Sequence, residues 1–395
     1  MERLFNLSRI KIISVPERFK RFLISEVDWS QRLIGIKGAR GTGKTTLLLQ
    51  QLKNLSPAEA VYVSLDDIYF GENHLVHFAE SFARNGGKYL FLDEVHKYPN
   101  WSQEIKNIYD SLPELNIVFT SSSALEIQKG KYDLSRRALI YELPGLSFRE
   151  FLMLKYEMDL PAITLDQILA RHEADIFNHQ PGFKPYKYFA EYLQHGYYPY
   201  FAGDEVHYHA RLNETINQVL ESDLPAIFNI NYEAIIKLKK LLFILSAIVP
   251  YKPNINKLAQ QIGSTRDTLL RYLYFLHHAH IIRWLSNESE GINFLNKPDK
   301  LYLENTNIEF ALGKQLVKSG TIRETFFLNQ LSVNHKLAYP EKGDFLVDNK
   351  YTFEIGGRKK GNRQILGIEE AYIVSDEIEF GSLNKLPLWI FGFLY

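Results

Sequence analysis

The sequence contains no cysteine, which excludes a disulfide framework, a zinc site with thiolate ligands and a cysteine nucleophile. It also lacks an apolar run of the roughly 18 residues that a membrane helix needs. Its first 25 residues mix Arg, Lys and Glu with scattered apolar positions, which does not fit a signal peptide. We therefore expect a cytoplasmic protein without a membrane partner.

The chain has no excess of either charge, because 46 Lys and Arg residues balance 46 Asp and Glu residues. The molecule as a whole therefore has no attraction for a polyanion, and any contact with nucleic acid has to come from a local patch. The hydrophobic content of 46% and the charged content of 23% are ordinary for a globular protein, so disorder is not expected.

At 395 residues the chain is too long for a single hydrophobic core. Changes in the hydrophobic pattern predict several parts in sequence order. These are a helical lead-in at 1–30, an α/β core at 31–145, a helical segment at 146–232, a helix-turn-helix part at 233–292 and a small α/β part at 293–395.

The most specific motif is a glycine-rich loop between a predicted buried strand and a predicted helix. Gly38, Gly43, Lys44 and Thr45 match the spacing G-x-x-x-x-G-K-[ST] without a gap. Glycines let phosphate oxygens approach the backbone, whose N–H groups and helix N-terminus supply a positive field. Lys44 would reach the β- and γ-phosphates, and the Thr45 hydroxyl would bind Mg²⁺. We therefore expect ATP to bind at Gly38, Ala39, Arg40, Gly41, Thr42, Gly43, Lys44, Thr45 and Thr46.

A later buried strand ends in two carboxylates, Asp93 and Glu94. A parallel strand of this kind delivers acidic side chains to the carboxyl edge of its sheet. We expect Asp93 to hold Mg²⁺, directly or through water. Glu94 is the predicted catalytic residue that polarises the attacking water.

Two further side chains are candidates for catalysis. Ser122 lies in a run of serines after the next predicted strand, where it can contact the γ-phosphate or the attacking water. The alternative for these hydroxyls is to cap the following helix. Arg137 precedes the fifth predicted strand and can neutralise transition-state charge in its own or a neighbouring subunit, or else form a surface ion pair.

Five predicted strands separated by helices indicate right-handed crossovers and a parallel, doubly wound sheet. Together with the glycine-rich loop, Asp93-Glu94, Phe119-Thr-Ser-Ser-Ser and Leu146-Ser-Phe-Arg-Glu-Phe-Leu152 resemble the AAA-superfamily ATPases of bacteria and archaea. The resemblance is to the group whose P-loop α/β core is followed by a winged helix-turn-helix and a nuclease-like α/β domain of uncertain function. It implies an enzyme that binds and hydrolyses ATP with Mg²⁺.

Residues 233–292 predict a winged helix-turn-helix from their own pattern. Two short helices flank a turn at Gly263-Ser264, with Ser264 as the expected N-cap of the second helix, and a hairpin follows. Arg266 and Arg271 can point outward from that second helix. Such a part either binds DNA or packs against the nucleotide domain or a protein partner, and both alternatives stay open.

Glu324, Asp344 and Glu354 lie where the PD-(D/E)xK nuclease fold implied by the resemblance places its acidic Mg²⁺ ligands. That chemistry also needs a lysine two residues after the last carboxylate, where this chain has Gly356. Lys360 and its neighbour can substitute only if the flexible Gly-Gly turn before them aims them well, which we do not expect. The pattern therefore predicts a degenerate, vestigial site without nuclease activity.

The sequence thus predicts an AAA-type ATPase that uses its C-terminal parts to bind DNA or a protein partner. One alternative is a binding switch on DNA or protein that retains ATP and turns it over slowly. Another is an ATP-dependent DNA nuclease. The oligomeric state stays open.

Overall fold

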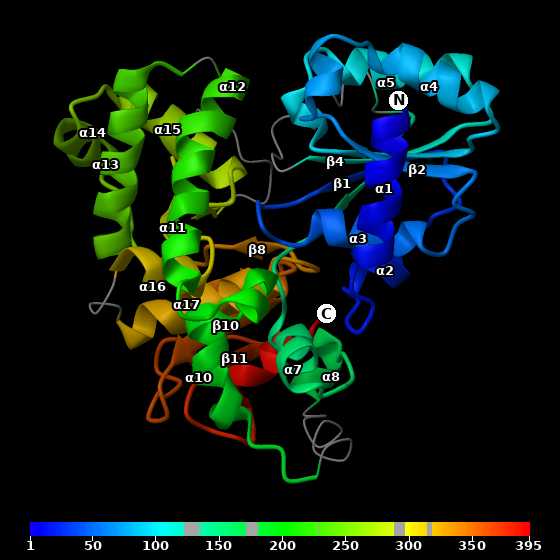
Figure 1. Cartoon of the computed structure of the whole chain (residues 1–395). Coiled ribbons are helices and arrows are strands. Elements are labelled where there is room, and N and C mark those ends of the chain that lie inside the picture. Colours follow the sequence, from blue (N-terminus) through cyan, green and yellow to red (C-terminus); the bar gives the residue numbers. More distant parts are fainter. Residues whose placement is uncertain (122–133, 135, 171–180, 229, 288–296, 314–317) are drawn as a thin grey trace. The chain divides into compact units, whose positions relative to one another are not determined.

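The computed structural model describes residues 1–121, 134, 136–170, 181–228, 230–287, 297–313 and 318–395. The chain divides into two compact units, Met1–Gly145 and Leu146–Tyr395, and both contain helices and strands (Figure 1). Within the described part, no helix combines the length and the apolar character needed to span a bilayer.

The first unit is built on a five-stranded sheet in which all neighbouring strands are parallel. The strands are β1 (Leu33–Lys37), β2 (Ala60–Ser64), β3 (Tyr89–Asp93), β4 (Asn116–Ser121) and β5 (Leu139–Glu142). Their order in the sheet is β2-β3-β4-β1-β5, so β4 lies between the strand that enters the glycine-rich loop and the strand that ends in Asp93. The predicted parallel sheet is confirmed.

Both faces of this sheet are covered, because side chains along a strand alternate between two apolar cores. Leu92 of β3 packs with α4 (Leu75–Arg84) and α5 (Trp101–Ser111) on one face. Its neighbour Phe91 packs with α3 (Lys44–Leu52) on the other, and Figure 1 shows the sheet between these layers. The other helical elements of the unit are α1 (Glu2–Ser14), α2 (Leu23–Glu26), η1 (Ile68–Gly71) and η2 (Val95–Lys97).

The second unit opens with a capped helix, α7 (Phe148–Tyr156). The Glu150 N–H donates to the Ser147 hydroxyl at 3.1 Å, and the Ser147 N–H donates to the Glu150 carboxylate at 3.3 Å, which forms a capping box. The Ser147 hydroxyl also donates to the Tyr395 carbonyl at 2.8 Å. The next helical elements are α8 (Leu165–Leu169), α10 (Pro185–His195), η3 (Pro199–Gly203), α11 (Tyr208–Gln218), η4 (Val219–Asp223) and α12 (Leu224–Phe228).

Three helices and a hairpin follow. They are α13 (Tyr232–Ile248), α14 (Ile255–Ile262), α15 (Arg266–His278), β6 (Ile282–Leu285) and β7 (Lys300–Leu303). The strands β6 and β7 are antiparallel, with Ile282 opposite Leu303. The hairpin therefore runs across the division that the sequence suggested between residues 292 and 293.

The N-cap of α15 differs from the prediction by one residue. Thr265, not Ser264, accepts the hydrogen bond of the cap, from the Thr268 N–H at 3.3 Å. The reason is that Ser264 still belongs to the end of α14, where its N–H donates to the Ala259 carbonyl at 2.9 Å. Gly263 makes this helix end possible with a left-handed φ of 66°.

The last part of the chain has a mixed five-stranded sheet with the order β12-β11-β10-β9-β8. The pairs β8–β9 and β9–β10 are antiparallel, whereas β10–β11 and β11–β12 are parallel. A further α/β part therefore follows the helical segment, as predicted. Its elements are α16 (Thr306–Gly313), α17 (Ser319–Leu331), β8 (Leu337–Ala338), β9 (Phe345–Val347), β10 (Tyr351–Gly356), β11 (Ala371–Ser375), β12 (Lys385–Pro387) and η5 (Leu388–Phe393).

Candidate functional site

The glycine-rich loop connects β1 to α3, and its backbone requires glycines at several positions. Gly41 and Gly43 have φ of 86° and 95°, in the left-handed region that residues with a Cβ rarely adopt. Gly38 is required for another reason, because a Cβ there would lie 2.3 Å from the carbonyl oxygen of Leu143. The motif predicts that Gly38 lets a phosphate approach the backbone. The structure shows that the neighbouring backbone at Leu143 also excludes any side chain at this position.

The Lys44 side chain is buried against the loop that precedes it. Its ammonium donates to the carbonyls of Gly38 at 3.0 Å and Ala39 at 2.9 Å. Because α3 begins at Lys44, this charge and the N-terminal N–H groups of the helix lie at the same loop. Of the other predicted loop residues, Arg40 is half-buried and Thr46 is exposed.

Asp93 is buried at the end of β3, and its carboxylate accepts hydrogen bonds from three hydroxyls. Thr45 donates to one oxygen at 2.6 Å and Tyr62 donates to the same oxygen at 2.8 Å. Thr120 donates to the other oxygen. Burial and the nearby carboxylate raise the pKa of Tyr62 well above its ordinary value, so its phenol remains a donor. The two predicted metal ligands, Thr45 and Asp93, are thus in direct contact.

Glu94 follows with a left-handed φ of 53°, which is uncommon for glutamate, and its N–H donates to the Thr120 hydroxyl at 3.2 Å. Its carboxylate lies 3.5 Å from Nε2 of His96, whose side chain is only 2% exposed. Nδ1 of the same imidazole lies 3.3 Å from the Ser121 hydroxyl. The imidazole therefore connects Glu94 to the end of β4. Sequence reasoning gave His96 no role, because only the tertiary contact reveals one.

Arg21 is a second residue that sequence reasoning missed. Its buried guanidinium donates to the Thr42 carbonyl at 2.6 Å and to the carbonyls of Pro144 and Gly145 at 2.8 and 2.9 Å. Arg21 therefore fastens the glycine-rich loop to the segment after β5. No sequence signal separates it from the other basic residues of the lead-in, since its partners are main-chain atoms.

Ser122 and Arg137 are the two remaining catalytic candidates. Ser122 lies outside the described residues. The Arg137 guanidinium donates to both carboxylate oxygens of Asp110, at 2.9 and 3.0 Å. Within its own unit Arg137 thus takes the surface-pair alternative, and a role toward a neighbouring subunit stays a prediction.

The donor set around Asp93 fits a nucleotide with a divalent cation. Carboxylate and hydroxyl oxygens are hard ligands of the kind that Mg²⁺ binds, and Thr45 and Asp93 supply one of each. Lys44 and the first N–H groups of α3 provide positive charge for phosphates at the same place. The residues present therefore fit ATP and Mg²⁺ together.

The structure also brings together the three carboxylates predicted near the C-terminus. The Glu324 carboxylate accepts hydrogen bonds from Lys300 at 2.6 Å and from Tyr302 at 2.9 Å. The Lys300 ammonium lies 3.9 Å from the Asp344 carboxylate. Burial raises the pKa of Glu324 and of Glu354, and repulsion from the neighbouring carboxylates adds to both shifts.

Lys360 contradicts the expectation that no lysine would be aimed at this cluster. Its ammonium forms an ion pair with Glu354, whose side chain is 1% exposed. Its Cγ lies 2.5 Å from the position that a Cβ on Gly356 would occupy. The absence of a side chain at Gly356 thus makes room for a lysine from four residues later. In consequence, Glu354 has an ammonium partner, as Glu324 does.

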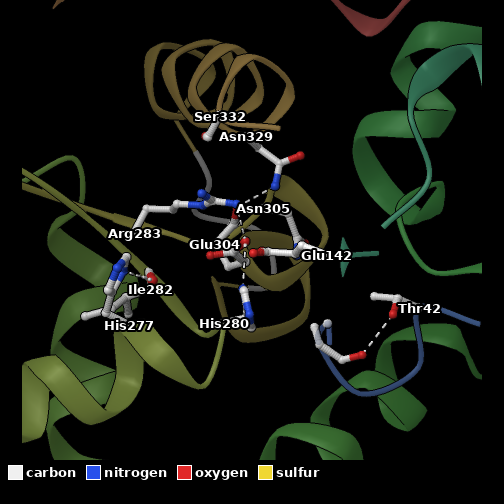
Figure 2. A network of polar contacts seen from close by, with 12 residues as sticks. Thr42, Glu142, His277, His280, Ile282, Arg283, Glu304, Asn305, Asn329 and Ser332 are labelled. Carbon is white, nitrogen blue, oxygen red and sulfur yellow. Dashed lines mark hydrogen bonds and ion pairs between the residues drawn. The ribbon is translucent and has the colours of Figure 1, made fainter. Parts of the chain in front are cut away.

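A separate buried network lies at the β6–β7 hairpin (Figure 2). The Glu304 carboxylate, 2% exposed, pairs with Arg283 at 2.7 Å and lies 3.7 Å from Nδ1 of His280. The side chain of Asn329 in α17 donates to the main-chain carbonyl of Glu304 at 2.9 Å. The network therefore links the hairpin to α17 within the second unit, an arrangement that the sequence did not predict.

Comparisons with protein families identify two stretches of the chain. Residues 30–152 match the family described as "AAA domain". Residues 186–314 match a family described as a domain of unknown function (DUF8612). A search of the curated proteins found no significant match. The first unit, from residue 30 onward, is thus similar to the AAA domain family.

Three solved structures show distant similarity to this chain. PCH-2 of C. elegans is 19% identical with a TM-score of 0.25, over 39% of this chain and 44% of that chain. AMPPCP-bound DnaA from Aquifex aeolicus is 17% identical with a TM-score of 0.28, over 64% and 84%. A DNA replication initiation factor is 15% identical with a TM-score of 0.27, over 67% and 84%. The chain thus spans less than half the length of PCH-2, and TM-scores this low carry no inference about activity or partners.

Proposed function

Because residues 30–152 match the AAA domain family and include the glycine-rich loop, we propose that the protein is an ATPase that binds and hydrolyses Mg-ATP. The observation that carries the proposal is the 2.6 Å contact between Thr45 and Asp93. It places a hydroxyl from the helix after the loop against a carboxylate at the end of an internal strand. A carboxylate that accepts hydrogen bonds from hydroxyls is suited to receive a cation.

Each polar residue of this site has a distinct role in the proposal. Lys44 and the first N–H groups of α3 bind the phosphates of ATP. Thr45 and Asp93 hold Mg²⁺, which when bound neutralises phosphate charge. Glu94 orients the attacking water and accepts its proton. His96 is a positioning residue, since its imidazole contacts the Glu94 carboxylate.

In the proposal, hydrolysis drives a rearrangement that the second unit transmits to DNA or to a protein partner. The succession of α14, α15 and the β6–β7 hairpin supports a winged helix-turn-helix in that unit. The Glu324, Asp344 and Glu354 cluster is proposed to be a vestigial nuclease centre, because Lys300 and Lys360 already pair with Glu324 and Glu354 and would compete with a metal ion.

The test is steady-state ATP hydrolysis by wild type, Lys44→Ala and the control Lys106→Ala, which removes a lysine from the surface of α5. We expect Lys44→Ala to lower the rate at least about 100-fold, the usual scale for a lost charge-stabilising group, and Lys106→Ala to leave it unchanged. Equal rates in Lys44→Ala and wild type would overturn the proposal. Tight ATP retention with negligible turnover in wild type would favour the slow binding switch instead.

A further inference from the structure

The surface of α14 and α15 carries a cluster of positively charged side chains, although the net charge of the whole chain is zero. Between residues 249 and 287 the sequence contains five Lys and Arg residues and one acidic residue, Asp267. Arg283 is one of the five and pairs with Glu304 in the buried network. The other four are all exposed: Lys252, Lys257, Arg266 and Arg271.

Two of these cations line a cavity of about 360 Å³ at the start of α14. Lys252 precedes α14, Arg266 is the first residue of α15, and Lys297 reaches the same cavity from the segment before β7. The side-chain amides of Asn254 and Asn256 add polar groups to the lining. No carboxylate is among its described lining residues, and Asp267, which pairs with Arg266, lies outside that lining.

The contacts of these cations keep them charged and leave them accessible. The Lys252 ammonium lies 4.8 Å from the centre of the Tyr339 ring, a cation–π contact that holds it in place. A hydrogen bond with Tyr339 raises the pKa of Lys252, so it stays protonated. Arg266 meets Asp267 at 3.6 Å, with side chains 53% and 85% exposed. Because so exposed a pair is weak, Arg266 can exchange this partner for another anion.

We propose that this face, centred on the cavity, binds the phosphate backbone of duplex DNA. In a helix-turn-helix the second helix enters the major groove and the first crosses the backbone, which places positive helix starts against phosphates (α14 and α15 in Figure 1). Cations spread along two helices and a preceding loop fit a repeating polyanion better than a single small anion. The proposal names the partner that the proposed function leaves open, and it rests on that function only for coupling to ATP.

The experiment is fluorescence anisotropy of a labelled duplex of about 30 base pairs, long enough to cover one such module, titrated with the full chain over a range of KCl concentrations. Lys252→Ala combined with Arg266→Ala is compared with Arg84→Ala combined with Lys342→Ala. The second pair removes one arginine and one lysine that are exposed elsewhere. Thermal unfolding of both double variants verifies that they are folded.

We expect the first pair to weaken binding at least about 10-fold and to reduce the slope of log K against log salt by about 2, one for each lost phosphate contact. The control pair should leave affinity and slope unchanged. The proposal is overturned if the two pairs behave alike, or if wild type does not bind the duplex at low salt. Competition by double-stranded RNA of the same length, as effective as by DNA, would also overturn the assignment to DNA.

Hydrolysis and binding are measured on the same preparations, so their failures can be distinguished. Lys252→Ala with Arg266→Ala should hydrolyse ATP without DNA at the wild-type rate, because neither residue lies in the nucleotide site. Lys44→Ala should bind the duplex normally while lacking hydrolysis. Loss of DNA binding in Lys44→Ala would overturn the independence of the two sites.

Discussion

The two units hold their buried carboxylates in different ways. In the first unit, Asp93 accepts hydrogen bonds from three hydroxyls. In the second, Glu324 meets the Lys300 ammonium and Glu354 meets Lys360. Hydroxyls stabilise a carboxylate without cancelling its charge, whereas an ammonium balances it.

The comparison shows that the partners of a carboxylate decide what its charge can do. A cation arriving at Asp93 adds to the existing hydrogen bonds, while one arriving at Glu324 has to compete with a lysine. The sequence predicts Asp93 as a Mg²⁺ ligand from its place after a buried strand, and the second group only from the resemblance to a nuclease fold. Only the structure distinguishes them.

The largest expected effect comes from neutralising one aspartate in each unit. We expect Asp93→Asn to lower Mg²⁺-dependent ATP hydrolysis at least about 100-fold, the scale typical of a lost charge-stabilising group, and Asp344→Asn to leave it unchanged. Phosphate release measures both. If the wild-type protein cleaved duplex DNA in the presence of Mg²⁺ and Asp344→Asn did not, the contrast between the two units would be contradicted.

Removing Lys300 should make the carboxylates of the second unit resemble Asp93 of the first unit, because they lose an ammonium partner. Lys300→Met leaves Glu324 and Asp344 without their shared cation, and breaking a buried pair in this way costs about 3–5 kcal/mol of stability. Urea unfolding in EDTA measures the loss, and added Mn²⁺ should recover part of it. Undiminished stability, or no response to Mn²⁺, would contradict the role given to Lys300.

A smaller effect is expected from the residue that fastens the glycine-rich loop. Arg21→Lys keeps the charge but cannot donate to three carbonyls in a planar fork, so the loop should be less well held. We expect the KM for ATP to rise about 10-fold, the equivalent of one or two lost hydrogen bonds, with a smaller change in kcat. Arg9→Lys on the surface of α1 is the control, and equal KM values in the two variants would contradict the account.

Glu309 sharpens the comparison, because the described structure gives its buried carboxyl a single hydroxyl donor, Thr325. Burial raises the pKa of Glu309 from 4.5 to about 8. The folded protein therefore keeps a proton that the unfolded chain releases, and stability falls as the pH rises from 4.5 toward 8. Glu309→Gln should remove this decline, which makes it more stable than wild type by about 4 kcal/mol at pH 8 and nearly equal at pH 4.5. Urea unfolding at several pH values measures the free energy of unfolding of both proteins. If the two stabilities changed with pH in the same way, Glu309 would not be the titrating group.

Much of the first unit could be predicted from its sequence because its signals are local. The loop glycines, the strand that ends in Asp93 and the alternation of Phe91 and Leu92 follow from spacing and hydrophobicity alone. The two helices around Gly263 are also present as α14 and α15, with Leu258 and Leu269 buried.

The remaining features depend on approaches between distant segments. Arg21 acts on main-chain carbonyls, and Gly38 is required by the carbonyl of Leu143, which directly follows β5 far along the chain. Lys360 reaches Glu354 only because Gly356 leaves space for its side chain. No periodicity or spacing encodes such contacts, so the sequence does not reveal Arg21, gives Gly38 a different reason and leads to a wrong expectation for Lys360.

The most direct test of the central claim is to compare ATP binding and hydrolysis in wild type and Glu94→Gln. The substitution keeps the size of the side chain and removes its ability to accept a proton from water. The account predicts nearly unchanged ATP affinity and a hydrolysis rate lowered at least about 100-fold, the range of general-base catalysis. Hydrolysis by Glu94→Gln at the wild-type rate would contradict it.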